Sequence, residues 1–320
     1  GRARSASHLA GITTRDVLKK GCSVICLDGV GRRARRWWDS HRRESLRAVI
    51  SLMIVVALVW LGYQFWRLLW GAGPIWLTSP VGAVDLKIRV GEVQSWFAGI
   101  PIYRQPVNAM DPPATYALLW PFLGWGTFTT ARWLWAGTSI AALGALISLI
   151  VRESGADTRF ERVLVALVPL SMYATGATIG NGQLMVHLLP ALLAGLLQLR
   201  GEASCLRDLL SAALVLFALV KPSVAAPFVW IVLLTPGRLR PALLVGIGYG
   251  GLTVLAGLFQ KAGLWLLLRE WLARASRMSI SAGESNLHMW LASLGLARWI
   301  GPASALVLLG LGAWVWRHRQ

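Results

Sequence analysis

Residues 51–66 read SLMIVVALVWLGYQFW, an apolar run within a longer segment, residues 46–70, that carries almost no charge. About 20 apolar helical residues cross the hydrocarbon core of a bilayer, so this segment predicts a transmembrane helix. Trp66 and Trp70 follow at its far end, where aromatic rings favour the membrane–water interface. Arg67 can extend its guanidinium toward the same headgroups. This first span indicates a protein whose solvent is lipid.

The composition of the whole chain agrees with that class. Of its 320 residues, 56% are hydrophobic and only 14% are charged, whereas soluble domains carry roughly a quarter charged residues. We predict an all-α, polytopic integral membrane protein with about 8–10 transmembrane helices, although several apolar runs are shorter than one full span. After the first span, these runs lie at about 114–127, 131–151, 162–179, 183–199, 209–220, 223–234, 242–260 and 302–316.

The formal net charge of +18 is concentrated at the N-terminus. Residues 1–47 contain twelve Lys/Arg against four Asp/Glu, and such clusters flank a first span on its cytoplasmic side or attract anionic headgroups. Nucleic acid is not an expected partner, because no groove-reading motif accompanies Arg32–Arg36. We interpret residues 1–45 as a poorly ordered basic cytoplasmic tail, with at most a short helix near Trp37, and residues 46–320 as one multi-span membrane domain.

Cysteines and short motifs exclude several classes of protein. Cys22, Cys26 and Cys205 form no disulfide framework, and the Cys22/Cys26 spacing has no second pair to complete a zinc site. The phosphate-loop, dinucleotide, zinc-protease and nucleophile-elbow motifs of soluble enzymes are absent. We therefore expect no metal or organic cofactor.

No signal-peptide core precedes the first span, which is expected to act as an uncleaved signal anchor.

Two long polar segments separate the apolar runs. Residues 84–97, VDLKIRVGEVQSWF, predict an amphipathic helix lying along the membrane surface. Pro112 and Pro113 then favour a helix start, where a missing backbone N–H costs nothing. Residues 261–300 mix Trp, Arg and polar residues and predict a second loop with surface helices. The apolar face of the first predicted surface helix comprises Leu86, Val90, Val93 and Phe97.

Charged residues at or within a membrane are costly and usually functional. Asp85, with Lys87, Arg89 and Glu92 on the same surface helix, is either a catalytic carboxylate at the lipid boundary or an ordinary loop acid. Lys221, before a proline inside an apolar stretch, either extends to water or faces a polar cavity, where it suits a phosphate.

Two further polar groups remain open at this point. The segment Asn181–Gly182–Gln183 either binds a sugar or a phosphate, or simply forms a turn, for which Asn-Gly is a common pair. Asn286 and His288 close the second loop, and His288 is a general acid/base, a phosphate donor or a satisfied interfacial histidine. His187, inside an apolar run, is interpreted as a hydrogen-bonding residue between helices.

The distribution of arginines predicts the topology. Arg200 and Arg207 flank one loop, and Arg238 and Arg240 lie in another. Placing both loops in the cytoplasm puts the Asn181–Gln183 turn, Lys221 and the second polar loop outside, on the side of Asp85. Two full spans at 114–127 and 131–151 would invert this order, so either one of these runs does not span or the interpretation of residues 209–234 as two half-helices is wrong.

In this order, the polar elements resemble the polyprenol-phosphate-mannose-dependent mannosyltransferases of glycosyltransferase family 87, which have a multi-span GT-C fold. The resemblance covers about residues 46–316 and departs at Asp111, where the family usually has Tyr. An early end after Trp316 suggests a chain truncated at the C-terminus. The elements that carry it are Asp85, the G-x-P-x-Y element Gly99–Tyr103, Pro112-Pro113 with ATYALLWPF, Gly182-Gln183, Lys221-Pro222 and SNLHMWLASL at 285–294.

The resemblance implies inverting transfer of a sugar, mannose by default, from a polyprenyl phosphate to a glycolipid or glycan acceptor. It places the site on the outer face of a bacterial plasma membrane. Asp85 would be the base. Lys221, then Arg89 or Arg104, would stabilise the departing phosphate. The expected sugar ligands are Gln183, Asn181 and Asn286, with His288 and Asp111 also taking part.

Two rival functions stay open on the sequence. A transporter or flippase for a lipid-linked or anionic substrate also places polar residues in broken helices. The chain lacks a clear inverted repeat, and its polar residues gather toward one face. A membrane scaffold without activity is the other rival. Convergence of the polar groups on one outward site would favour the enzyme.

Overall fold

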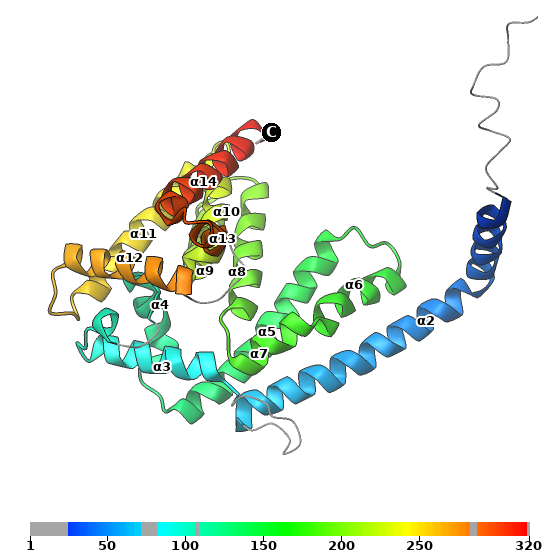
Figure 1. Ribbon diagram of the computed structural model, residues 1–320, viewed down its shortest axis with the longest axis horizontal. Helices are drawn as coiled ribbons and strands as arrows, with labels where there is room; N and C mark the ends of the chain where they lie inside the picture. The colour runs from blue at the N-terminus through cyan, green and yellow to red at the C-terminus, as the bar shows by residue number, and fades with distance from the viewer. Residues whose placement is uncertain (1–24, 72–81, 106–108, 282–286, 319–320) are drawn as a thin grey trace, which may run out of the picture. The chain divides into compact units, whose positions relative to one another are not determined.

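The computed structural model describes residues 25–71, 82–105, 109–281 and 287–318, and within these ranges the chain forms helices and turns (Figure 1). Most of the predicted apolar runs coincide with a helix. The elements are α2 (Ile25–Trp70), α3 (Val84–Phe97), η1 (Ile102–Arg104), α4 (Pro113–Leu123), α5 (Phe128–Glu153), α6 (Arg159–Ser171), α7 (Tyr173–Asn181), α8 (Met185–Leu197), η2 (Gln198–Arg200), α9 (Cys205–Ala218), α10 (Pro222–Leu234), α11 (Leu239–Gly257), α12 (Leu264–Ser281), α13 (Leu287–Ser293), η3 (Ala297–Trp299) and α14 (Ile300–Arg317).

The chain divides into two compact units, Gly1–Leu52 and Met53–Gln320. In the first unit, helix α2 already begins at Ile25, so the expectation of a poorly ordered tail up to residue 45 was wrong for its second half. No proline interrupts residues 25–45, and the six arginines there favour helix. Once the apolar span has nucleated, extending the helix toward the N-terminus costs little.

Four helices among the described residues are long and apolar enough to cross a membrane, and a pair bent by 49°, α6 with α7, makes a fifth. The all-α membrane fold is confirmed, but this number is lower than the expected 8–10 because α4, α8, α9 and α10 have only 11 to 14 residues. The short α4 means that, of the successive runs at 114–127 and 131–151, only the second is long enough to span. The four long helices are Glu44–Trp70, Phe128–Glu153, Leu239–Gly257 and Ala297–Arg317.

Within the second unit, α5 runs between two ends of the helix bundle. Near its start, Arg132 donates to the carbonyl oxygen of Gly82 at 3.4 Å, next to the start of α3. At its other end, Glu153 pairs with Arg200 of η2 at 2.7 Å. At 1.5 Å per residue, α5 with its 26 residues is about 39 Å long and connects these two ends. We call them the α3 end and the arginine end.

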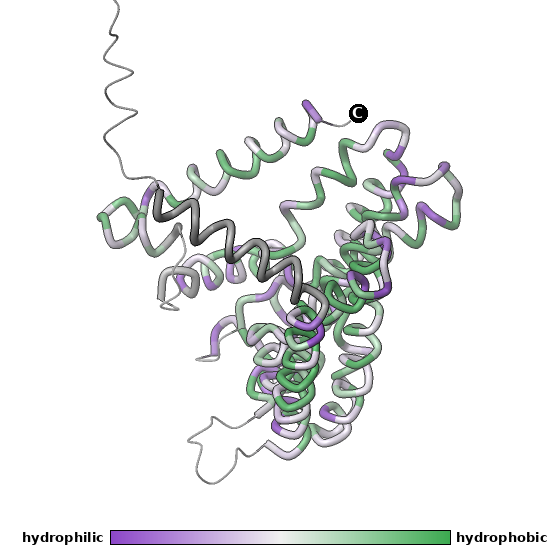
Figure 2. The backbone as a smooth tube through the Cα atoms, turned by 90° about the vertical axis from the view of Figure 1, so that its right-hand side faces the viewer, coloured by the Kyte–Doolittle hydropathy of each residue, from purple (hydrophilic) through white to green (hydrophobic). Residues whose placement is uncertain are grey.

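Helices α9, α10 and α11 join the same two ends. At the arginine end, Arg238 before α11 pairs with Asp208 of α9 at 2.6 Å. At the α3 end, Trp96 donates to the carbonyl oxygen of Ala256 at 2.9 Å, near the end of α11. Hydrophobic residues run along most helices (Figure 2). The arginine end carries Arg152, Arg200, Arg207, Arg238 and Arg240, linked through Glu153, Gly201 and Asp208.

Helix α3 has the predicted bounds and the predicted apolar face, with Leu86, Val90 and Val93 buried. That face packs in the hydrophobic core with side chains of α4, α5 and α7, so protein rather than lipid covers it. Trp96, also buried, stacks on Tyr116 of α4 with ring centroids 4.6 Å apart. The core therefore holds α3, and with it the charged residues of α3, in one orientation.

Candidate functional site

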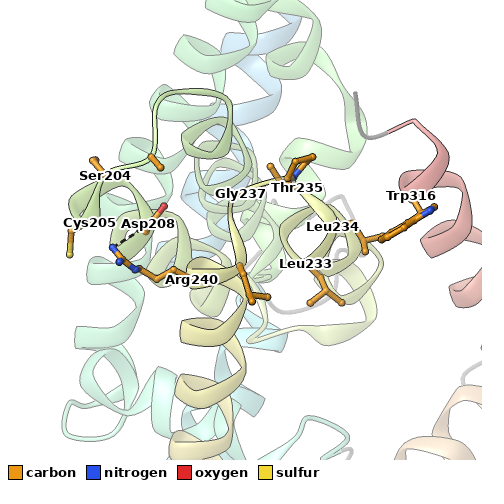
Figure 3. Close-up of a pocket in the computed structure, with 12 residues that line it drawn as sticks. Ser204, Cys205, Asp208, Leu233, Leu234, Thr235, Gly237, Arg240 and Trp316 are labelled. Carbon is orange, nitrogen blue, oxygen red and sulfur yellow. Dashed lines mark ion pairs between the residues drawn. The ribbon is translucent and has the colours of Figure 1, made fainter.

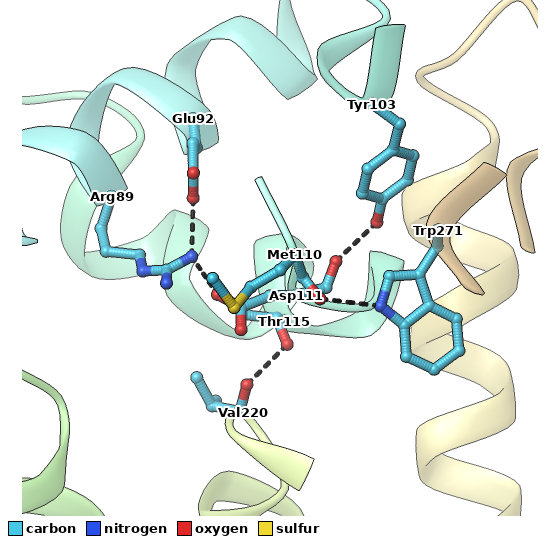
Figure 4. A network of polar contacts seen from close by, with 8 residues as sticks. All are labelled: Arg89, Glu92, Tyr103, Met110, Asp111, Thr115, Val220 and Trp271. Atoms are coloured by element: carbon cyan, nitrogen blue, oxygen red, sulfur yellow. Dashed lines mark hydrogen bonds and ion pairs between the residues drawn. The ribbon is translucent and has the colours of Figure 1, made fainter. Parts of the chain in front are cut away.

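A charged cluster lies where α3 meets the start of α4 (Figure 4). Arg89 of α3 lies between two carboxylates: its Nη1 atom is 2.7 Å from Glu92 Oε2 and also pairs with Asp111. Both acids are buried, whereas the Arg89 side chain is 17% exposed. Because a buried carboxylate is stable only when paired, Arg89 holds the two acids together.

The backbone around Asp111 is held from two sides. Tyr103 donates its hydroxyl to the carbonyl oxygen of Asp111 at 2.6 Å, and Trp271 of α12 donates to the carbonyl oxygen of Met110 at 2.9 Å. Pro113 then begins α4, with Pro112 as the N-cap residue, as the sequence predicts. The carboxylate of Asp111 thus lies just before a helix N-terminus, where the helix dipole favours negative charge.

Lys221 reaches this cluster from α10. Thr115 of α4 donates to the carbonyl oxygen of Val220 at 2.7 Å, which fixes the residue before Lys221 against the first turn of α4. Burial raises the pKa of Asp111, while the positive charges of Arg89 and Lys221 act in the opposite direction. Two of the predicted site residues, Asp111 and Lys221, therefore lie near each other although they are far apart in sequence.

Glu92 belongs to this charged cluster but is not among the predicted site residues. Burial raises its pKa to about 7, against the opposing effect of Arg89 and with a further rise from Asp111. Its Oε1 atom has no hydrogen-bond partner among the described residues. The sequence did contain a signal: Arg89 and Glu92 form an i, i+3 pair of opposite charge beside the apolar face of α3.

The predicted turn Asn181–Gln183 lies against the start of α3. The backbone N–H of Ala83 donates to the carbonyl oxygen of Gly180 at 2.8 Å. Gly182 has φ +71°, and a Cβ atom there would come within 2.6 Å of the Leu86 side chain. Only glycine fits this close approach. The turn thus contacts residues on both sides of Asp85.

The side chains of this turn have partners of their own. Asn181 accepts a hydrogen bond from Arg67 of α2, and Thr178 donates to Gln183 Oε1 at 3.5 Å. Arg67 is 7% exposed and also donates to Gln64 at 3.1 Å. The expectation that Arg67 extends to the headgroups was therefore wrong, because the side-chain oxygens of Gln64 and Asn181 bind its guanidinium in a buried position.

Asp85 differs from the other acids of this end. It lies in the first turn of α3, is partly exposed, and has no hydrogen bond or ion pair among the described residues. Arg89 follows one helical turn later: burial lowers the pKa of the Arg89 guanidinium, whereas the nearby charges of Asp111, Glu92 and, least of all, Asp85 raise it. Asp85 is thus an open carboxylate between the Asn181–Gln183 turn and the Arg89–Asp111 pair.

The remaining predicted site residues do not join this group. Arg104 pairs with Glu270 of α12 at 2.7 Å, and its side chain is 56% exposed. Asn286 lies outside the described residues, and only the backbone of His288 is described, in α13. His187 lies 3.0 Å from the Thr138 hydroxyl, which confirms the predicted hydrogen bond between helices.

The family model of glycosyltransferase family 87 matches residues 110–320. The chain belongs to glycosyltransferase family 87. No curated protein and no solved structure matches it. As a member of this family the protein is a glycosyltransferase, so neither the transporter nor the inactive scaffold is favoured. Asp111, Asn181, Gln183 and Lys221 lie within the matched residues, whereas Asp85 and Arg89 precede them.

Proposed function

We propose that this glycosyltransferase moves a sugar, mannose first among the candidates, from a polyprenyl phosphate to a hydroxyl group of a glycolipid or glycan acceptor, with inversion. One observation carries the proposal: an open carboxylate, Asp85, lies one turn from Arg89, which itself pairs with Asp111 near Lys221. A proton acceptor and positive charge are what such a transfer requires.

In the proposed reaction, Asp85 takes the proton of the acceptor hydroxyl as its oxygen attacks the anomeric carbon. The bond from that carbon to the phosphate oxygen breaks, and the bonding electron pair leaves with the polyprenyl phosphate. The transition state resembles an oxocarbenium ion, as in glycoside hydrolysis. A single base on the acceptor side is sufficient, so no second carboxylate is needed close to Asp85.

Lys221 is the proposed partner of the leaving phosphate. It has no hydrogen bond or ion pair among the described residues, and it is half-buried at the start of α10. Arg89 is already engaged by Glu92 and Asp111, so its contribution is to hold the site and to add positive potential. Gln183 and Asn181 are the proposed ligands of the sugar hydroxyls from the neighbouring turn.

A lipid-linked donor suits the location of the site. The α3 end lies at the ends of the candidate spans α5 and α11, and spans end near the lipid headgroups. A polyprenyl chain can then stay in the bilayer while its phosphate and sugar reach Lys221 and Asp85. By the resemblance to its family, the fold is of the GT-C kind and the site lies on the outer face.

The test is sugar transfer in membranes that contain the protein, with radiolabelled polyprenyl-phosphate-mannose as donor and a nucleotide-linked mannose in parallel. Asp85→Asn should lower transfer by about 10²–10⁴-fold, the usual contribution of a general base. Asp157→Asn is the matched control: Asp157 is an exposed acid in the α5–α6 connection at the arginine end, and its variant should keep wild-type transfer.

Other results would contradict parts of the proposal. Equal transfer by wild type and Asp85→Asn would remove Asp85 from the mechanism. Transfer from the nucleotide-linked sugar alone would exclude the lipid-linked donor. Transfer of glucose but not mannose from polyprenyl phosphate would leave the donor class standing and change the sugar.

A further inference from the structure

A cavity of about 640 Å³ lies at the arginine end, between the starts of α9 and α11 and the end of α10 (Figure 3). It is separate from the α3 end, because α10 has Lys221 at its first end and the cavity at its other end. One wall is apolar and the other is polar. The apolar side includes Leu233, Leu234, Leu239 and Trp316, and the polar side includes Cys205, Asp208 and Arg240.

The cavity lies at the depth of the lipid headgroups. Leu239 is the first residue of the candidate span α11, and Trp316 is the penultimate residue of the candidate span Ala297–Arg317. The ends of spans meet the membrane–water interface, where tryptophan is also favoured. A cavity lined by two such ends opens where the headgroup of a lipid meets its acyl chains.

Asp208 and Arg240 are the charged residues that line the cavity, and Arg238, buried behind Asp208, adds a second positive charge. The Oδ1 atom of Asp208 pairs with the buried Arg238 at 2.6 Å. Its Oδ2 atom lies 3.8 Å from Arg240, whose side chain is 64% exposed. One carboxylate opposite two guanidinium groups leaves a positive charge on Arg240. The ligand that fits is an anion with an apolar part.

We propose that this cavity binds an anionic phospholipid from the leaflet at the arginine end. The phosphate pairs with Arg240, and an acyl chain lies along Leu233, Leu234 and Trp316. A volume of about 640 Å³ is in the range of pockets that hold small ligands and accommodates a headgroup with the first part of a chain. This site does not depend on the identity of the transferred sugar.

Cys205 provides a local reporter, because it lines the cavity and is exposed. In a protein with Cys22 and Cys26 changed to serine, the rate at which N-ethylmaleimide modifies Cys205 measures access to the cavity. We expect this rate to be several-fold lower in nanodiscs of phosphatidylcholine with phosphatidylglycerol than in phosphatidylcholine alone. Equal rates in the two bilayers would overturn the proposal.

A matched pair of variants separates the cavity from a general effect of surface charge. Arg240→Gln should abolish the protection by phosphatidylglycerol. Arg152→Gln should keep it, since Arg152 lies at the same end, is 66% exposed, and does not line the cavity. Protection that persists in Arg240→Gln, or that is lost equally in both variants, would overturn the site.

A third arm distinguishes lipid from free phosphate. Inorganic phosphate in the buffer of phosphatidylcholine nanodiscs should leave the modification rate unchanged. Protection by inorganic phosphate equal to that by phosphatidylglycerol would overturn the lipid as occupant. A single elution peak and an unchanged thermal midpoint for Arg240→Gln would show that any lost protection does not come from misfolding.

Discussion

At the scale of single residues, the burial of Glu92 should make the stability of the protein depend on pH. Its pKa is about 7 in the folded protein and about 4.3 in an unfolded chain. The folded state therefore binds a proton more tightly. This contribution to stability is complete below about pH 4 and is lost as the pH rises through about 7.

The variant Glu92→Gln tests this effect, because glutamine keeps the shape and the oxygen acceptor but cannot ionise. Between pH 5.5 and pH 8, wild type should lose about 2 kcal/mol of stability more than the variant. The measurement is the thermal midpoint of both proteins in detergent micelles at the two pH values. Parallel midpoints at both pH values would mean that Glu92 titrates at its ordinary pKa.

At the scale of elements, one buried ion pair joins two helices. Asp208 of α9 and Arg238 before α11 are 4–6% exposed in their side chains and lie 2.6 Å apart. Asp208→Asn would leave a buried guanidinium without its carboxylate and should destabilise the protein by about 3–5 kcal/mol.

The control for this pair lies at the same end of the bundle. Glu153→Gln breaks the exposed pairs with Arg200 and Arg152, whose side chains are 73% and 66% exposed. Exposed pairs contribute less than about 1 kcal/mol, so this variant should unfold close to wild type. The midpoint of thermal unfolding ranks the three proteins. Equal midpoints for both variants would contradict a buried pair.

Elements were more predictable than contacts. The bounds of α3 follow from its apolar periodicity, and the start of α4 follows from Pro112 and Pro113, since both are properties of neighbouring residues. The pairing of Arg89 with Asp111 could not be predicted, because it depends on how the chain returns from η1 to α3. For the same reason, the sequence placed Arg67 at the headgroups rather than against Asn181.

At the scale of the whole second unit, the fold separates the α3 end, which holds the candidate site, from the arginine end. Basic residues mark the cytoplasmic side of membrane proteins. An impermeant maleimide should therefore modify Cys205 in inside-out vesicles. With Cys205 changed to serine, a cysteine in place of the exposed Lys87 of α3 should react in right-side-out vesicles. Both background proteins carry serine at Cys22 and Cys26.

The reverse pattern would turn the protein over in the membrane and place Asp85 in the cytoplasm. Reaction of both cysteines from one side would contradict the arrangement in which α5 separates the two ends. Either result would leave the contacts around Arg89 unchanged, since those contacts lie within the α3 end.

The short helices have a consequence for the membrane itself. Helices α8 and α10 have 13 residues each, about 20 Å of helix, against a hydrocarbon core of about 30 Å. Both expose apolar side chains, Leu189 and Phe228 among them. A bilayer beside them meets a hydrophobic mismatch of about 10 Å, which a bilayer beside the longer α5 does not. The length of the acyl chains sets the thickness of the bilayer and therefore the size of this mismatch at the two ends of α10. Lys221 lies at one of these ends.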